Sequence, residues 1–279
     1  MAEKFVDING IRICYQVQGD GYPFVLLHGF GMYKEFWKFH IKELSKEFKI
    51  ITIDIRGCGK TDHPSEPSSM EELADDVRAL LDYLDVDKAH LGGHSFGGMI
   101  AQHFALKYPN RLNKLILMST FANLPMSKSG LEMYKRSQLS SYEAKIKDST
   151  DAFWDKMKHR FSRNFFKEMN QDPSKIFHNT FSTNELIELE ETKGTSKPQD
   201  ILNQINAITK HNTVNRLNEV NNKTLILAAA KDRLIPPIAS ELLDEKIPNS
   251  KLIVFNSGHF FMLEEAPNFN LEVLNFLRQ

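Results

Sequence analysis

The chain has 279 residues with nearly balanced charge, 35 basic and 36 acidic side chains, and can bury one large core or one core with an insertion. The balance offers no basic surface for nucleic acid, so we expect a small-molecule partner. The only cysteines, Cys14 and Cys58, are far apart, which indicates neither a disulfide framework nor a metal site. No apolar run reaches the roughly 20 residues of a membrane span, and the first residues lack a signal-peptide core. We therefore expect a cytoplasmic protein.

Strand and helix signals alternate along most of the chain. Asn9-Gly10 is a two-residue turn signal between apolar runs and predicts an opening hairpin. Ser69 and Glu72 form a capping box that opens a helix. Such alternation predicts an α/β fold with a mostly parallel sheet covered by helices on both faces. The predicted strands are 5–8, 11–15, 24–27, 49–54, 88–91, 114–118, 224–228 and 251–255, and the predicted helices are 34–48, 69–84, 99–106, 237–246 and 267–277.

The alternation stops between the strand at 114–118 and the one at 224–228. Residues 121–221 mix polar residues with many Phe and Met residues, and we expect helices and no strands there. We therefore predict a core domain of residues 1–120 and 222–279 with a helical insertion of residues 121–221.

A Gly-x-Ser-x-Gly sequence lies between a predicted strand and a predicted helix. This is the setting of a nucleophile elbow, in which Ser95 adopts strained backbone angles and exposes its hydroxyl. Gly93 and Gly97 are needed because side chains there would collide with the neighbouring strand and helix. The pentapeptide alone is only moderately specific, and its setting strengthens the prediction.

The chain resembles the α/β-hydrolase fold family over nearly its whole length. The resemblance rests on four features in the family's order: His28-Gly29-Phe30-Gly31, Asp54-Ile55-Arg56-Gly57-Cys58-Gly59, the Ser95 elbow, and Asp232 with Gly258-His259 after the last two strands. In that family the nucleophile, acid and base follow one another as Ser, Asp and His, which implies a catalytic triad of Ser95, Asp232 and His259.

The chemistry of these side chains supports the same roles. A serine needs a base to accept its proton, and histidine has an unperturbed pKa of about 6.5, suited to that task near neutrality. His259 and Asp232 each follow a predicted buried strand, so both can lie at the sheet edge that carries Ser95. Asp232 can then orient the imidazole and stabilise its protonated form.

The resemblance also implies an oxyanion hole. Its two donors would be the backbone N–H groups of Phe30 and Phe96, with Gly29 in the loop that carries Phe30. We expect a structural role for His28 and a structural loop pair between Asp54 and Arg56. Asp62, Asp75 and Asp76 precede the nucleophile and are expected in solvated segments. Gly59-Lys60-Thr61 resembles the end of a phosphate-binding loop, but the first glycine of that motif is missing.

The family places its cap where residues 121–221 are inserted. Most aromatic residues of a helical cap form its own core, and the others would line an apolar substrate pocket, for which we name Trp154, Phe161 and Phe260. No cluster of Arg or Lys stands out to hold a carboxylate or phosphate, so an uncharged or weakly polar ester is favoured. We expect neither a metal nor a cofactor.

The predicted function is hydrolysis of a small, largely apolar carboxylic ester through an acyl-enzyme on Ser95. Alternatives with the same triad are cleavage of a lactone, an enol-lactone or a carbon–carbon bond. Cofactor-free peroxidase and thioesterase activities are further options, the latter disfavoured by the lack of a basic groove. An alternative of another class is a ligand receptor on a hydrolase scaffold. The sequence leaves the natural substrate and the oligomeric state open.

Overall fold

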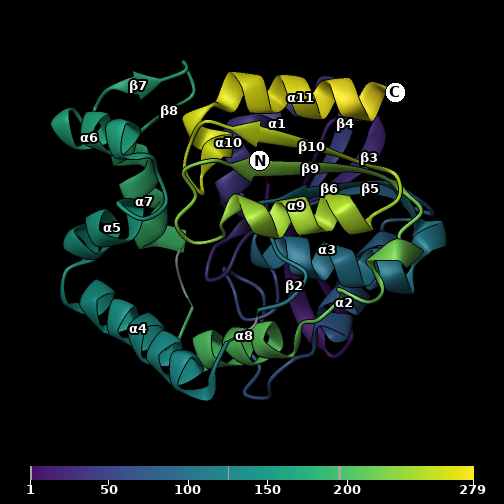
Figure 1. Cartoon of the computed structure of the whole chain (residues 1–279), viewed down its shortest axis with the longest axis horizontal. Coiled ribbons are helices and arrows are strands. Elements are labelled where there is room, and N and C mark those ends of the chain that lie inside the picture. Colours follow the sequence, from purple (N-terminus) through teal and green to yellow (C-terminus); the bar gives the residue numbers. More distant parts are fainter. Residues whose placement is uncertain (1, 125, 194–195) are drawn as a thin grey trace.

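The computed structural model describes residues 2–124, 126–193 and 196–279. In this part of the chain, eight strands form one sheet in the order β1-β2-β4-β3-β5-β6-β9-β10 (Figure 1). Strand β2 is antiparallel to β1 and β4, and the other neighbours are parallel. The strands are β1 (Lys4–Ile8), β2 (Ile11–Gln18), β3 (Tyr22–Leu27), β4 (Phe48–Ile53), β5 (Ala89–His94), β6 (Leu112–Met118), β9 (Lys223–Ala229) and β10 (Ser250–Phe255).

Both faces of the sheet are covered, as predicted. In β3, Phe24 and Leu26 join one hydrophobic cluster while Val25 and Leu27 join another, because successive side chains of a strand point to opposite faces. Figure 1 shows α11 on one side of the sheet and α3 on the other. The cluster of Val25 includes residues of α2 (Met70–Tyr83), α3 (Phe96–Lys107) and α9 (Pro237–Lys246), and the cluster of Phe24 includes residues of α1 (Lys38–Leu44) and α11 (Ala266–Arg278).

Local signals explain where several elements begin and end. Ser69 Oγ accepts from Glu72 N at 3.1 Å and Glu72 Oε2 accepts from Ser69 N at 2.8 Å, so the predicted capping box forms. The helix predicted at 34–48 is shorter, a 3-10 turn (Lys34–Trp37) followed by α1, because β4 already begins at Phe48. Strand β5 continues beyond the predicted 88–91 to His94.

The chain between β6 and β9, here called the β6–β9 segment (residues 121–221), is largely helical, and Figure 1 shows it beside the ends toward which β9 and β10 point. The expectation of no strands there was wrong, because a small antiparallel hairpin turns at His178 and Asn179. Two-residue strands are too short to show an alternating pattern. The elements are α4 (Lys128–Lys147), α5 (Ser149–Met157), α6 (Arg163–Gln171), β7 (Ile176–Phe177), β8 (Phe181–Ser182), α7 (Thr183–Lys193) and α8 (Pro198–Lys210). No helix among the described residues has the length and apolar character needed to cross a bilayer.

Candidate active site

Ser95 occupies a sharp turn between β5 and α3. Its φ of 53° and ψ of −113° are strained for a residue with a side chain. The turn is held by Ser95 N, which donates to Met118 O at 2.8 Å, and by Thr120 Oγ1, which donates to Ser95 O at 2.8 Å. A Cβ on Gly93 would lie 2.2 Å from Gly97 O, so the strand and the helix approach too closely there for any side chain. The geometry is that of a nucleophile elbow.

Asp232 and His259 form a hydrogen-bonded pair at the same edge of the sheet. They follow the carboxyl ends of β9 and β10, and His259 Nδ1 donates to Asp232 Oδ2 at 2.7 Å. Asp232 Oδ1 accepts from the backbone N–H groups of Leu234 at 2.8 Å and Ile235 at 2.9 Å. Burial opposes ionisation of Asp232, but the His259 ring and these N–H groups outweigh burial and lower the pKa of the carboxyl. The Nδ1 bond therefore orients the imidazole, and its Nε2 makes no hydrogen bond among the described residues.

His94 joins the elbow to the His259 loop. Its ring centroid is 4.6 Å from that of His259, and its Nε2 donates to His259 O at 3.2 Å. Burial, followed by the charge of His259, lowers the pKa of His94 well below its usual value, so this ring is a neutral packing group. In the described part of the chain, Ser95 Oγ takes part in no hydrogen bond, and catalytic contacts of this kind commonly tighten only when substrate binds.

The loop after β3 passes directly beside Ser95. A Cβ on Gly29 would lie 3.1 Å from His94 Nδ1 and 3.5 Å from Ser95 Cβ. His28 Nδ1 donates to Gly29 O at 2.8 Å, while Ile55 N donates to His28 Nε2 at 3.1 Å. Burial lowers the pKa of His28 to about 4. A neutral ring with both nitrogens bonded fits a role in shaping the loop.

The loop is also held from the β6–β9 segment. Gly31 N donates to Gln204 Oε1 of α8 at 3.0 Å, and the Phe30 ring lies edge-on to Phe96, with 6.5 Å between centroids. Phe96 begins α3, where first-turn N–H groups have no acceptor within the helix. Two regions far apart in sequence thus determine where the N–H groups of Phe30 and Phe96 lie.

An apolar cavity of about 310 Å³ lies between the sheet domain and the β6–β9 segment. Of the three predicted pocket residues, Phe260 lines it. Phe161 is buried behind Phe260, with 5.6 Å between ring centroids, and Trp154 packs on Phe153 and Phe166 outside the cavity. The lining consists of Met32, Tyr33, Phe36, Phe39, Phe153, Met157, Leu186, Leu189, Glu190, Phe260 and Leu263.

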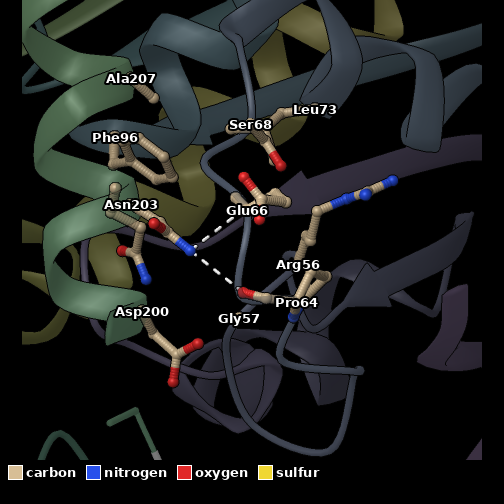
Figure 2. A pocket seen from close by; sticks show the side chains of 11 residues that line it. Arg56, Gly57, Pro64, Glu66, Ser68, Leu73, Phe96, Asp200, Asn203 and Ala207 are labelled. Atoms are coloured by element: carbon tan, nitrogen blue, oxygen red, sulfur yellow. Dashed lines mark hydrogen bonds between the residues drawn. The ribbon is translucent and has the colours of Figure 1, made fainter. Parts of the chain in front are cut away.

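A second cavity of about 300 Å³ separates α8 from the loop after β4 (Figure 2). Figure 2 shows Asn203 reaching from α8 toward that loop, where its Nδ2 donates to the carbonyl oxygens of Pro64 at 3.1 Å and Glu66 at 3.2 Å. These bonds fasten α8, and with it Gln204, to the sheet domain.

Two expectations about charged residues were wrong. Asp54 and Arg56 do not pair with each other, because Asp54 accepts from Lys34 Nζ at 2.9 Å while Arg56 binds Asp76 through Nε at 2.9 Å and Nη2 at 2.8 Å. Asp76 was expected in a solvated segment, yet it is buried by this pairing. Both ion pairs brace the loop after β4 against its neighbours.

The structure also assembles a cluster of cations that sequence analysis missed. Lys156 Nζ lies 2.8 Å from Glu190 Oε1, and Lys145 Nζ lies 3.6 Å from the same oxygen. Arg160, four residues after Lys156, is close enough to interact electrostatically with Glu190. The expectation that no such cluster holds a substrate anion stays a prediction, since both lysines bind Glu190. The four-residue spacing of Lys156 and Arg160 was the available signal, but their meeting with α4 and α7 depends on tertiary packing.

A doubly covered parallel sheet with a strained serine turn and an Asp–His pair at its carboxyl edge defines a hydrolase of the α/β type. The chain belongs to the α/β-hydrolase fold family, whose family model matches residues 22–266.

Relatives in this family carry several activities. The chain is 28% identical to a protein of Agrobacterium fabrum named "Putative carbamate hydrolase RutD", covering 91% of this chain and 93% of that protein. It is also 28% identical to the 2-hydroxy-6-oxo-6-phenylhexa-2,4-dienoate hydrolase of Comamonas testosteroni, covering 98% of this chain and 93% of that protein. Among solved structures, a thermophilic esterase of Thermogutta terrifontis is similar with a TM-score of 0.82 and 26% identity, covering 100% of this chain and 98% of that one.

Proposed function

We propose that the protein is a serine hydrolase that cleaves carboxylic esters of small, largely apolar substrates. The observation that carries this proposal is the 2.7 Å pair of Asp232 and His259 at the sheet edge that also holds the Ser95 elbow. The similarity to the Thermogutta esterase supports the choice of an ester.

In the proposed mechanism, Ser95 Oγ attacks the ester carbonyl while His259 accepts its proton. The N–H groups of Phe30 and Phe96 hold the tetrahedral oxyanion, and the start of α3 adds its positive end. His259 then protonates the departing alcohol. A water activated by His259 attacks the acyl-enzyme, and return of the proton to Ser95 releases the acid.

Residues 121–221 act, in this proposal, as a cap over a core of residues 1–120 and 222–279. Support comes from the 310 Å³ cavity, because its lining combines residues of the loop after β3 with residues of α5 and α7. An apolar enclosure of this kind, lined by Phe260 next to His259, favours a hydrocarbon acyl group.

The second candidate keeps the triad and cleaves a carbon–carbon bond or a lactone. It is favoured by the similarity over 98% of this chain to the dienoate hydrolase of Comamonas testosteroni. Since both activities require the same three side chains, the substrate must separate them.

A panel of short aryl esters, an aryl carbamate, lactones and a dienoic ring-cleavage ketone tests the proposal. We expect the highest kcat/KM with the esters, and a higher value for the ketone or a lactone would replace ester hydrolysis with the second candidate. A fluorophosphonate probe should label Ser95 in the folded protein. Absence of both labelling and turnover would favour a ligand receptor.

A further inference from the structure

Three cations of the β6–β9 segment, Lys145, Lys156 and Arg160, surround the single carboxylate of Glu190. Glu190 receives Lys156 Nζ on both carboxylate oxygens, at 2.8 and 2.9 Å, and Lys145 Nζ donates to its backbone carbonyl at 3.0 Å. Burial opposes ionisation of Glu190, but the two lysines outweigh it and lower the pKa of the carboxyl. Glu190 is thus a carboxylate already satisfied by lysines.

Of the three cations described around Glu190, Arg160 is the one without an ion pair in the described structure. Its Nη1 donates to Lys156 O at 3.1 Å, and no carboxylate among the described residues lies within ion-pair distance of its guanidinium. A guanidinium carries five N–H donors, and the described residues accept a hydrogen bond from only one nitrogen of Arg160, so most of its donors have no partner in this part of the chain. Because Lys145 and Lys156 already bind Glu190, this carboxylate does not form an ion pair with Arg160.

The guanidinium of Arg160 lies over Phe260, the residue that follows His259. Its Cζ is 5.6 Å from the ring centroid of Phe260, which lines the 310 Å³ cavity and follows His259 in sequence. The backbone is fixed as well, because Phe260 N donates to Arg160 O at 2.9 Å. Arg160 is also close enough to interact electrostatically with His94 and Asp232, two residues that contact the His259 ring.

We propose that Arg160 binds a carboxylate carried by the substrate in addition to its scissile ester. The inference rests on the proposed function and narrows the substrate to an apolar ester with one anionic end, such as a monoester of a dicarboxylic acid. The planar fork of a guanidinium matches a carboxylate with two parallel hydrogen bonds, and partial burial strengthens such a pair.

Matched ester pairs test the inference through a ratio of kcat/KM values. One pair carries the charge on the acid, mono-4-nitrophenyl glutarate against 4-nitrophenyl pentanoate, and the other on the alcohol, 4-carboxyphenyl butyrate against phenyl butyrate. In Arg160→Met the anionic-to-neutral ratio of at least one pair should fall by roughly 10- to 100-fold, the range for a lost hydrogen-bonded charge pair. Arg160→Lys should keep part of the ratio. Lys158→Met removes an exposed cation two residues away and should leave both ratios unchanged.

Binding of free glutarate gives a readout that needs no turnover. Calorimetry on Ser95→Ala and on Ser95→Ala/Arg160→Met should show the affinity for glutarate falling by a similar factor. The inference stands if a substrate ratio or the glutarate affinity falls with Arg160, and it is overturned if neither does. The proposed function fails separately, if Ser95→Ala retains ester turnover.

Discussion

Glu264 holds the Gly258-His259 loop to the start of α6. Its Oε2 accepts from Gly258 N at 3.1 Å and from Ser162 N at 2.9 Å, and its Oε1 accepts from Ser162 Oγ. A buried carboxylate with three donors is costly to alter, because each donor left without an acceptor is unfavourable. Glu264 is therefore a positioning residue for His259.

Glu264→Gln should separate this role from a general effect on stability. A neutral amide loses the negative charge that strengthens the hydrogen bonds from Gly258 N and Ser162 N, so we expect the free energy of unfolding to fall by about 2 kcal/mol and kcat to fall by roughly 10-fold as His259 shifts. Denaturant unfolding and ester kinetics measure the two effects. The neighbouring Glu265→Gln is the control, because the carboxylate of Glu265 accepts only an exposed bond from Asn268, which an amide oxygen can keep. Reduced stability with unchanged kcat would argue against positioning of His259.

Ser95→Ala should remove nearly all ester turnover, on the order of 10⁴-fold or more, since no other group can form the acyl-enzyme. The substitution deletes one oxygen that takes no part in the hydrogen bonds of the described structure, so the melting temperature should change little. Ser129→Ala on the exposed face of α4 controls for an unrelated serine. Substantial residual kcat would remove Ser95 from the role of nucleophile.

Gln204 offers a test of the predicted oxyanion hole. Gln204→Leu leaves Gly31 N without its acceptor, so the loop can shift and carry the N–H of Phe30 out of line. We expect kcat to fall by about 10-fold with a smaller change in KM, because an oxyanion donor acts mainly on the transition state. Lys210→Leu at the exposed end of α8 should have no such effect. Equal kcat in the two variants would show that Gln204 does not position the loop.

His90 should make folding sensitive to acid. Burial, followed by the charge of Lys114, lowers its pKa from 6.5 to about 4, and Nδ1 has no hydrogen-bond partner among the described residues. A depressed histidine pKa means that the unfolded chain binds the proton more readily. The neutral His90 ring therefore makes its full contribution to the free energy of unfolding above pH 6.5, and this contribution is lost as the pH falls toward 4.

Comparison of urea unfolding at pH 7.5 and pH 5 measures this loss. By proton linkage, the decrease in the free energy of unfolding between pH 7.5 and pH 5 should be about 2 kcal/mol smaller in His90→Phe than in the wild type. A phenyl ring suits the site, since His90 already packs against Tyr22, Phe24 and Phe48. His159→Phe, at an exposed position, should leave the difference between the two pH values unchanged. The same loss in both variants would rule out His90 as its source.

The sheet could be predicted because its signals are local. Runs such as Phe24–Leu27 are apolar on both faces, which is typical of central parallel strands, and Pro237 begins α9 where predicted. Asp232 and His259 could be placed at one edge because parallel strands end together. The catalytic roles of Ser95, Asp232 and His259 stay predictions.

Features that join distant segments could not be predicted. The contacts of Glu190 with Lys145 and Lys156 depend on how three helices pack, and no spacing within one helix reveals them. Arg56 was assigned to Asp54 by proximity in sequence, whereas the fold brings Asp76 to it. Trp154 was named as a pocket residue, whereas its ring packs on Phe153 and Phe166 and does not line the apolar cavity, because the sequence does not reveal how α5 is oriented.

Gly258 lies against the backbone of the β6–β9 segment, where a Cβ would come within 2.5 Å of Arg160 O and 2.6 Å of Phe161 C. Main chain touches main chain at this junction, which leaves no room for a side chain to adjust. Substitutions in α7, which lines the apolar cavity and takes no part in this junction, should change the substrate range while the His259 loop stays in place. Replacing residues 160–162 should instead disrupt the Gly258-His259 loop, which packs against their backbone.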